Sequence, residues 1–387
     1  MKMKLYTAIA VILSIVISSC KQSSHDVQDV VLIDDDDAVE VNFEDVATDI
    51  RVVPLESDEA LPKYSSVQCY GKEMIFANDN GSSLYYFIDN KFISKLNAVG
   101  RGPGEYLTLG AYAYCPKEKI LYVKTIGAGD FSESIMYYSV PDMKYIGKVP
   151  VSGQVQYFTE YDENSFLAVM KNNSADSCSI NIIDKKSGNV IKKVQDINWY
   201  AYTHSYETMS SYNKNNRAYA ISCFNNSIGT INKDGEFVSR LETNFGRKNF
   251  SKEVLDIDAL NFTSSFLSLL EYMKNNEETL LIGCYYPIIS GNSISFWYEK
   301  ANNQGYYYYY RYKNGCDAHY KGFHIKGFKG LLKPFGVKDN TYLAIIEGGI
   351  DKYKNDDEEP SGIAKRIFDA MFQQKDENPV LVYFNIK

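Results

Sequence analysis

The chain lacks most of the residue patterns that mark an enzyme or a nucleic-acid-binding protein. Its 41 lysines and arginines are outnumbered by 49 aspartates and glutamates, which gives a formal net charge of −8. Binding of nucleic acid requires a basic face, so we expect no nucleic-acid partner. Nucleophile elbows and H-E-x-x-H motifs are missing. A P-loop or a G-x-G-x-x-G run that opens a helix is also missing, and we expect no cofactor.

Metal-ligand residue types are scarce. The chain has four histidines, and its seven cysteines include no C-x-x-C pair. The six cysteines after the N-terminal segment are widely spaced and read most simply as buried thiols, although an exported protein can oxidise some of them. One local cluster of metal-ligand types is present: Cys316, Asp317, His319 and His324. A separation of five puts the two histidines on opposite faces of an extended strand unless Gly322 introduces a turn, so we expect no metal site.

Long apolar runs are missing too, except at the N-terminus. Lys2 and Lys4 precede a short apolar stretch, Leu5 to Ile17, and Ser18-Ser19 lead directly to Cys20. This order predicts a signal peptide over residues 1–19. Small residues immediately before a cysteine are typical of a lipobox, so we expect lipidation of Cys20 and attachment to the membrane through a lipid anchor. An ordinary secretory signal followed by a chance cysteine is the alternative.

Residues 20–40 are expected to form an acidic tether. The run Asp34-Asp35-Asp36-Asp37 repels itself and resists packing. Such a tetrad can bind Ca²⁺, but the spacing, glycine and terminal glutamate of an EF-hand loop are absent. We therefore expect a solvated linker, followed by a single domain over residues 41–387.

What the chain has in quantity is aromatic residues and a repeat. Thirty-three tyrosines and 20 phenylalanines, with only 10 prolines, favour β-strands. A polar turn followed by a short β-rich run recurs six times, beginning at 71, 117, 162, 215, 276 and 338. A second hairpin follows most copies, so each period supplies a four-stranded sheet. The sequence therefore predicts an all-β fold, a six-bladed β-propeller of four-stranded blades, whereas a β-sandwich does not explain so long a repeat.

Two helical insertions interrupt the repeat, near 251–274 and 362–375. The second has an apolar stripe at helical spacing, which either packs on its own propeller or docks a partner. An early strand over 50–55 and a closing strand over 379–385 are expected to complete one blade from both ends of the chain.

Residues 100–106, Gly-Arg-Gly-Pro-Gly-Glu-Tyr, resemble the signature of the six-bladed β-propeller lipoproteins of Bacteroidetes. The closing segment 376–382 is similar to the usual C-terminus of that family. Together with the lipobox, the resemblance spans essentially the whole chain. It implies a location in the cell envelope, in the outer membrane, and leaves open which leaflet the protein occupies. The signature is specific for the family and not for a chemistry.

Within this heptad the candidate site residues are Arg101, Gly102, Pro103, Gly104 and Glu105. The two glycines suit unusual backbone angles at a crossover between blades, and the charged pair suits either structure or a ligand contact near the axis. Aromatic residues can also form sugar-binding platforms, most readily Trp199-Tyr200-Ala201-Tyr202, although packing between blades explains aromatics equally well.

Three functions stay open on these residues. The first is an envelope lipoprotein, without enzymatic activity, whose propeller binds a ligand or a protein partner, with glycans and envelope proteins as the expected classes. The second is a hydrolase or lyase with a site at the central channel, which needs acidic residues or a metal lining that channel. The third is a structural subunit of an outer-membrane complex that docks through the 362–375 helix.

Overall fold

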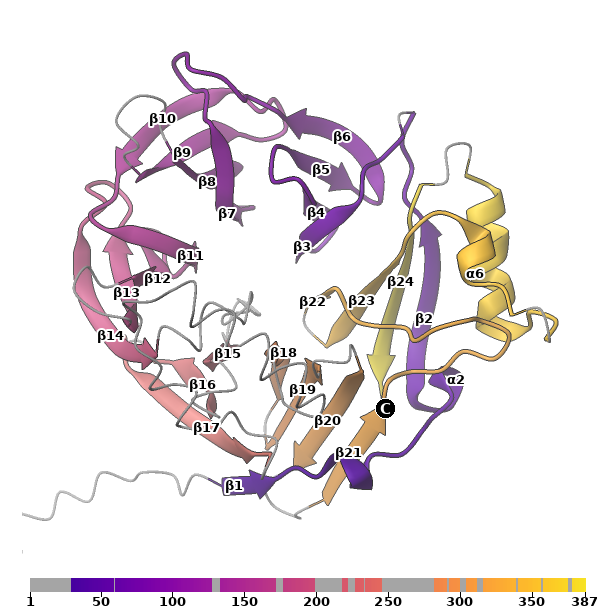
Figure 1. The fold of residues 1–387 in the computed structure, drawn as a ribbon. Helices are drawn as coiled ribbons and strands as arrows, with labels where there is room; N and C mark the ends of the chain where they lie inside the picture. Colours follow the sequence, from indigo (N-terminus) through magenta and orange to yellow (C-terminus); the bar gives the residue numbers. More distant parts are fainter. Residues whose placement is uncertain are drawn as a thin grey trace, which may run out of the picture.

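The repeated segments fold as six four-stranded sheets arranged in a ring (Figure 1). A computed structural model describes residues 29–387 except 59, 127–132, 172–176, 199–217, 222–226, 233, 246–281, 291, 300–303, 312–315, 339, 356–357 and 375–377. The protein is an all-β, six-bladed β-propeller, as the repeat predicts. Helical segments are few in the described part of the chain: η1 (Asp35–Asp37), α2 (Phe43–Val46), η4 (Ile350–Lys352) and α6 (Gly362–Phe372).

Blades one, two, three and five are each built from one continuous stretch of chain with antiparallel pairing throughout. Blades one and two contain β3 (Tyr64–Tyr70), β4 (Glu73–Asn78), β5 (Leu84–Ile88), β6 (Lys91–Leu96), β7 (Thr108–Cys115), β8 (Ile120–Ile126), β9 (Glu133–Ser139) and β10 (Tyr145–Pro150). Blades three and five contain β11 (Gln154–Glu160), β12 (Ser165–Lys171), β13 (Ser177–Asp184), β14 (Val190–Asn198), β18 (Ile282–Ser290), β19 (Ser293–Glu299), β20 (Gly305–Arg311) and β21 (Cys316–Lys321).

Blades four and six each take one strand from the N-terminal segment. Their strands are β15 (Ala218–Ile221), β16 (Ser227–Ile231), β17 (Phe237–Asn244) and β1 (Asp29–Leu32) in blade four, and β22 (Gly336–Lys338), β23 (Thr341–Ile346), β24 (Val380–Ile386) and β2 (Ala47–Pro54) in blade six. The antiparallel pair β2–β24 completes blade six from both ends of the chain, as predicted. This pairing closes the ring, because β2 belongs to the segment that precedes blade one and β24 belongs to the segment that ends blade six.

The predicted β-rich runs occupy the second strand of four blades, namely β4, β8, β12 and β23. In blade four the run is β15, at the opposite end of the sheet from β1. The repeat copy that begins at 276 lies largely outside the described residues, and the helix expected near 251–274 lies wholly outside them.

Residues 29–54, here called the N-terminal strap, cross the outer edges of blades four to six. β1 pairs parallel with β17, from Asp29 opposite Leu241 to Leu32 opposite Asn244. The strap then follows blade five, where backbone bridges join Val39 to Tyr320 and Asn42 to His324. A solvated tether is expected from the sequence up to residue 40. The structure instead places residues 29–40 against the propeller.

Alternation of side chains explains why this acidic segment packs. Val31 and Ile33 turn toward the interface between blades four and five, where Ile33 is buried. Asp34 accepts a hydrogen bond from the backbone N–H of Asp36 at 3.1 Å, which caps η1. Asp35 is buried, so the four aspartates do not share one solvated face.

Aromatic residues fill the spaces between blades. In β20, Tyr306 and Tyr308 pack toward blade four and the strap, while Tyr307 packs toward blade six. This explains why the run of tyrosines is apolar on both faces. Phe43 of α2 is fully buried and meets Phe384 edge-on with ring centroids 4.8 Å apart, which fixes the strap to blade six.

The helix predicted over 362–375 is present as α6, which packs against β2, β24 and η4. Its apolar stripe, including Ile363, Ile367 and Phe368, is buried on its own propeller, and Phe372 at its end is exposed. The N–H of Ile363 donates to Glu44 Oε1 at 2.8 Å, so a carboxylate from the strap stabilises the start of the helix.

Candidate functional site

The propeller has two faces that differ in which connections they carry. The hairpins between the first and second strands turn at 71–72, 116–119 and 161–164, and we call this side the turn face. The connection 97–107 between blades one and two lies at the opposite end of β7, on what we call the loop face. The two ends of β7 are separated by about 23 Å, given a rise of about 3.3 Å per residue.

The candidate loop Arg101–Glu105 lies on the loop face and closes on itself. Glu105 Oε2 accepts from the N–H of Gly102 at 2.6 Å, and the N–H of Glu105 donates to the carbonyl of Gly102 at 3.0 Å. Tyr106 is fully buried beneath the loop, and its hydroxyl donates to the carbonyl of Ser82 at 3.1 Å. The Glu105 carboxylate therefore orders the turn, and the phenol below joins it to the β4–β5 connection.

Gly104 adopts a left-handed conformation, with φ of 76°. A Cβ atom here would lie 2.6 Å from Cγ of Tyr145. The carbonyl of Gly104 accepts from the hydroxyl of Tyr138 at 3.0 Å. Only glycine fits this position, because both the backbone angle and the close ring exclude a side chain. Arg101 and Pro103 are exposed at the surface of the loop.

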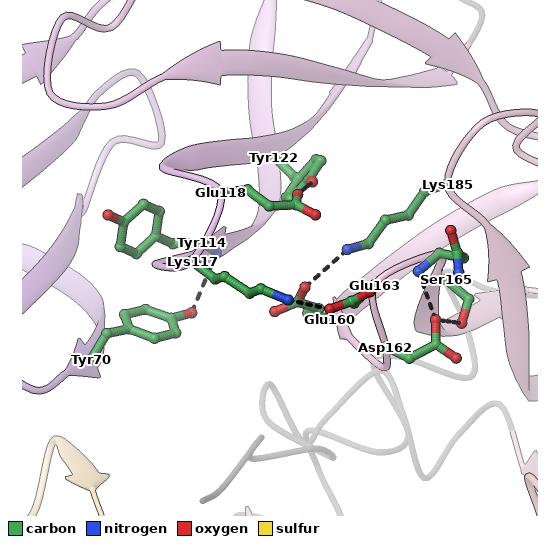
Figure 2. Close-up of polar contacts among 11 residues, drawn as sticks. Tyr70, Tyr114, Lys117, Glu118, Tyr122, Glu160, Asp162, Glu163, Ser165 and Lys185 are labelled. Carbon is green, nitrogen blue, oxygen red and sulfur yellow. Dashed lines mark hydrogen bonds and ion pairs between the residues drawn. The ribbon is translucent and has the colours of Figure 1, made fainter. Parts of the chain in front are cut away.

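A cluster of charged and phenolic side chains joins blades two and three on the turn face (Figure 2). Lys185 is buried and forms an ion pair with Glu160 at 2.9 Å, and its ammonium lies 5.2 Å from the ring centre of Tyr122. The hydroxyl of Tyr122 donates to Glu118 Oε2 at 2.6 Å. Lys117 and Glu163 form a further, exposed pair across the same boundary, visible in Figure 2.

A related cluster joins blades one and two. Glu73 accepts from Lys119, from Tyr86 and, at 3.1 Å, from the hydroxyl of Tyr114. Burial opposes ionisation of Glu73, but these three donors outweigh it and hold the pKa of the carboxyl below its ordinary value. An ionised carboxylate with three donors is suited to linking blades and not to transferring a proton.

A buried thiol beside the first of these clusters, that of Cys115, is also unsuited to chemistry. Burial raises the pKa of Cys115 to about 11, and the neighbouring Glu160 adds to the shift. Cys115 is therefore a neutral thiol at physiological pH, whereas a nucleophilic cysteine requires a lowered pKa. The sequence signal for these clusters is the repeated polar turn, whose charged residues meet across neighbouring blades.

A pocket of about 470 Å³ lies between the N-terminal strap and the outer strand of blade five. Its polar lining comes from two distant parts of the chain: Asp34, Asp37, Tyr308, Asp317, His319 and Tyr320. Leu32, Ile33, Val39 and Ala318 add an apolar part. The aspartate run and the 316–324 group are separate features of the sequence, and the structure brings members of both to one cavity.

The wall of this pocket contains a buried hydrogen-bond chain. The hydroxyl of Tyr298 lies 2.7 Å from Asp35 Oδ1 and 2.6 Å from His319 Nε2. A phenol has one proton, so when Tyr298 donates to Asp35, the imidazole must carry the proton that it shares with Tyr298. Burial lowers the pKa of His319, and the carboxylates of Asp35, Asp317 and Asp37 oppose that shift.

Comparison with known protein families assigns the chain to one family. The family described as a domain of unknown function, DUF4934, matches residues 27–385. The chain belongs to this family. No curated protein matches it.

One solved structure that is similar to this DUF4934 chain shows the same fold. It is the crystal structure of a Bacteroides fragilis protein, named as one inferred to be exported, with 17% identity and a TM-score of 0.67 over 93% of this chain and 100% of that chain. A protein of unknown function from Desulfotomaculum acetoxidans has 12% identity and a TM-score of 0.38 over 73% and 79% of the two chains. Hydrazine synthase of Kuenenia stuttgartiensis has 11% identity and a TM-score of 0.39 over 74% of each chain. The last two similarities are too loose to support an argument.

Among the described residues of this DUF4934 chain, no group of three or more His, Cys, Asp or Glu side chains is arranged to hold a metal ion. Asp317 instead accepts from the hydroxyl of Tyr308 at 2.8 Å, and the backbone of His324 bridges to the strap. Helices within the described ranges are too short or too polar to cross a membrane. Cys20 and the aromatic run 199–202 lie outside the described residues.

Proposed function

We propose that this protein is a lipid-anchored protein of the cell envelope, attached through Cys20, whose propeller binds a ligand or partner without catalysing a reaction. The lipobox supports the anchor, and the name of the Bacteroides fragilis neighbour supports export. The observation that carries the binding role is the pocket of about 470 Å³ under the N-terminal strap.

The lining of that pocket favours a ligand with a positively charged or hydrogen-bond-donating group. Three carboxylates face it, from Asp34, Asp37 and Asp317, and no lysine or arginine is among the described residues that line it. Phenol and imidazole groups supply further hydrogen-bond partners. Polar residues outnumber apolar ones in this lining, which suits a polar ligand, and a cavity of this size accepts a small molecule or one side chain of a partner.

An enzyme at the turn face is a weaker hypothesis. The carboxylates described there are already bound: Glu73 to Lys119 and Tyr114 of the neighbouring blade, and Glu160 to Lys185 of its own blade. The structural-subunit hypothesis loses its proposed dock, since the stripe of α6 is buried on its own propeller.

The test is a thermal-shift screen of the mature chain with Cys20→Ala, against amines, amino sugars, envelope glycans and divalent metals. A ligand that binds only the native state raises the melting temperature. At a concentration of one hundred times its Kd it adds about 2.7 kcal/mol to the free energy of unfolding. We expect a shift with cationic compounds that is lost in the double variant Asp37→Asn/Asp317→Asn. The matched control is Asp89→Asn/Asp142→Asn, which removes two exposed carboxylates from blades one and two. Equal shifts in the two double variants would contradict the pocket, and turnover of a glycan would instead support the enzyme.

A further inference from the structure

The N-terminal strap carries an exposed apolar surface next to the pocket. Val30, Leu32 and Val39 have exposed fractions of 63%, 67% and 55%. Val30 and Leu32 lie on the same face of β1, because side chains alternate along a strand, and Leu32 and Val39 both line the pocket. These three residues therefore border one region of the rim of the propeller, on blades four and five.

The short segment between Cys20 and β1 limits how far this surface can lie from the lipid anchor. Asp29 begins β1, and only eight residues separate it from Cys20. A fully extended chain spans at most about 3.3–3.6 Å per residue, so β1 begins within about 30 Å of the lipidated cysteine. Blade one, with its outer strand β6, lies across the ring from blade four and β1 (Figure 1).

The negative charge beside the apolar residues limits which lipid surface can bind this part of the propeller. Asp34, Asp36 and Asp37 are exposed beside the apolar residues, and Asp317 lies across the pocket. An anionic lipid surface would repel this group of carboxylates. A headgroup with an ammonium group would instead satisfy them, while its acyl region met Val30, Leu32 and Val39.

We propose that the strap region of blades four and five, centred on Leu32 and Val39, docks on the membrane in which Cys20 is anchored and takes an amine-bearing lipid headgroup into the pocket beside it. This inference rests on the proposed lipid anchor and adds an orientation to it. The propeller is held on its rim, so both the turn face and the loop face stay open to other partners.

The experiment uses the full-length, lipidated protein in liposomes whose acyl chains carry bromine, which quenches tryptophan fluorescence on contact. Leu32→Trp is compared with Ile93→Trp, which is 43% exposed on β6 of the opposite blade. The signal of the lipidated protein without either substitution is subtracted. In phosphatidylethanolamine liposomes we expect at least twofold more quenching for Leu32→Trp than for Ile93→Trp.

Two further arms separate the parts of the inference. Replacement of phosphatidylethanolamine by phosphatidylglycerol, or the double substitution Asp37→Asn/Asp317→Asn, should reduce the quenching of Leu32→Trp at least twofold. Unchanged quenching in both cases would overturn the role of the amine headgroup. Equal quenching of the two tryptophan variants, in protein whose acylation is verified by mass spectrometry, would overturn the docking while the anchor stands. Absence of acyl groups on Cys20 would refute the anchor itself.

Discussion

Replacement of Gly104 by alanine tests whether the Gly-Arg-Gly-Pro-Gly-Glu-Tyr loop is held by backbone geometry. A non-glycine residue in the left-handed region costs about 1–2 kcal/mol. The added Cβ would lie 2.6 Å from Cγ of Tyr145 and must displace that ring. Displacement weakens the edge contact between Tyr145 and Tyr138, whose centroids are 5.9 Å apart, at about 0.5–1.5 kcal/mol. The hydrogen bond from Tyr138 to the Gly104 carbonyl adds about 1 kcal/mol. Together these contributions should lower the free energy of unfolding by about 3 kcal/mol.

For a domain of this length the entropy of unfolding is about 0.75 kcal/mol per degree, from about 2.1 cal/mol/K per residue, so the melting temperature should fall by about 4 °C. Differential scanning calorimetry measures it. Gly147 and Gly330 serve as controls, since no described atom beyond their chain neighbours lies within 4 Å of the Cβ that alanine would add. Gly330 has φ of 103°, so Gly330→Ala should show the backbone cost alone, about 2 °C, while Gly147→Ala should change the melting temperature by less than 1 °C. If Gly104→Ala and Gly147→Ala had the same melting temperature, the reasoning would be refuted.

The remaining predictions concern the strap and the blade boundaries. Ile33→Ala should destabilise the protein by about 2–4 kcal/mol and increase hydrogen exchange in β1, whereas Val30→Ala, at an exposed position, should do neither; equal exchange in both would contradict the packing of the strap. The pKa of His319 is lowered in the folded state, so the unfolded chain binds a proton there more readily than the folded protein does. The free energy of unfolding should therefore fall as the pH drops below about 6.5, the ordinary pKa of histidine, by at most about 1.4 kcal/mol per pH unit. His319→Gln should therefore narrow the difference in melting temperature between pH 7.5 and 5.5, and an unchanged difference would show that other groups control it. Cys115 should resist iodoacetamide at pH 8 until the protein unfolds, as peptide mass mapping would show; rapid labelling would mean that its pKa is not raised.

Much of the fold is local information and could be read from the sequence. Each blade is made mostly of neighbouring hairpins, so a polar turn followed by a β-rich run, repeated six times, marks the blades directly. The apolar stripe of α6 and the closing pair β2–β24 were predictable for the same reason, because period and position along the chain decide them. Gly104 belongs here as well, since a glycine-rich crossover needs unusual backbone angles whatever surrounds it.

The site was not predictable, because its parts are far apart in sequence. Asp35 and Tyr298 are separated by 263 residues, and only the folded ring brings the hydroxyl of Tyr298 between Asp35 and His319. Charge repulsion in residues 34–37 predicted a solvated tether, yet the strap packs because Ile33 and Phe43 find apolar partners on blades four to six. The sequence by itself determined how many blades there are, and its repeat marked one strand in each of five of them. Tertiary structure decided which charges meet, because those contacts depend on the closure of the ring and the path of the strap across three blades.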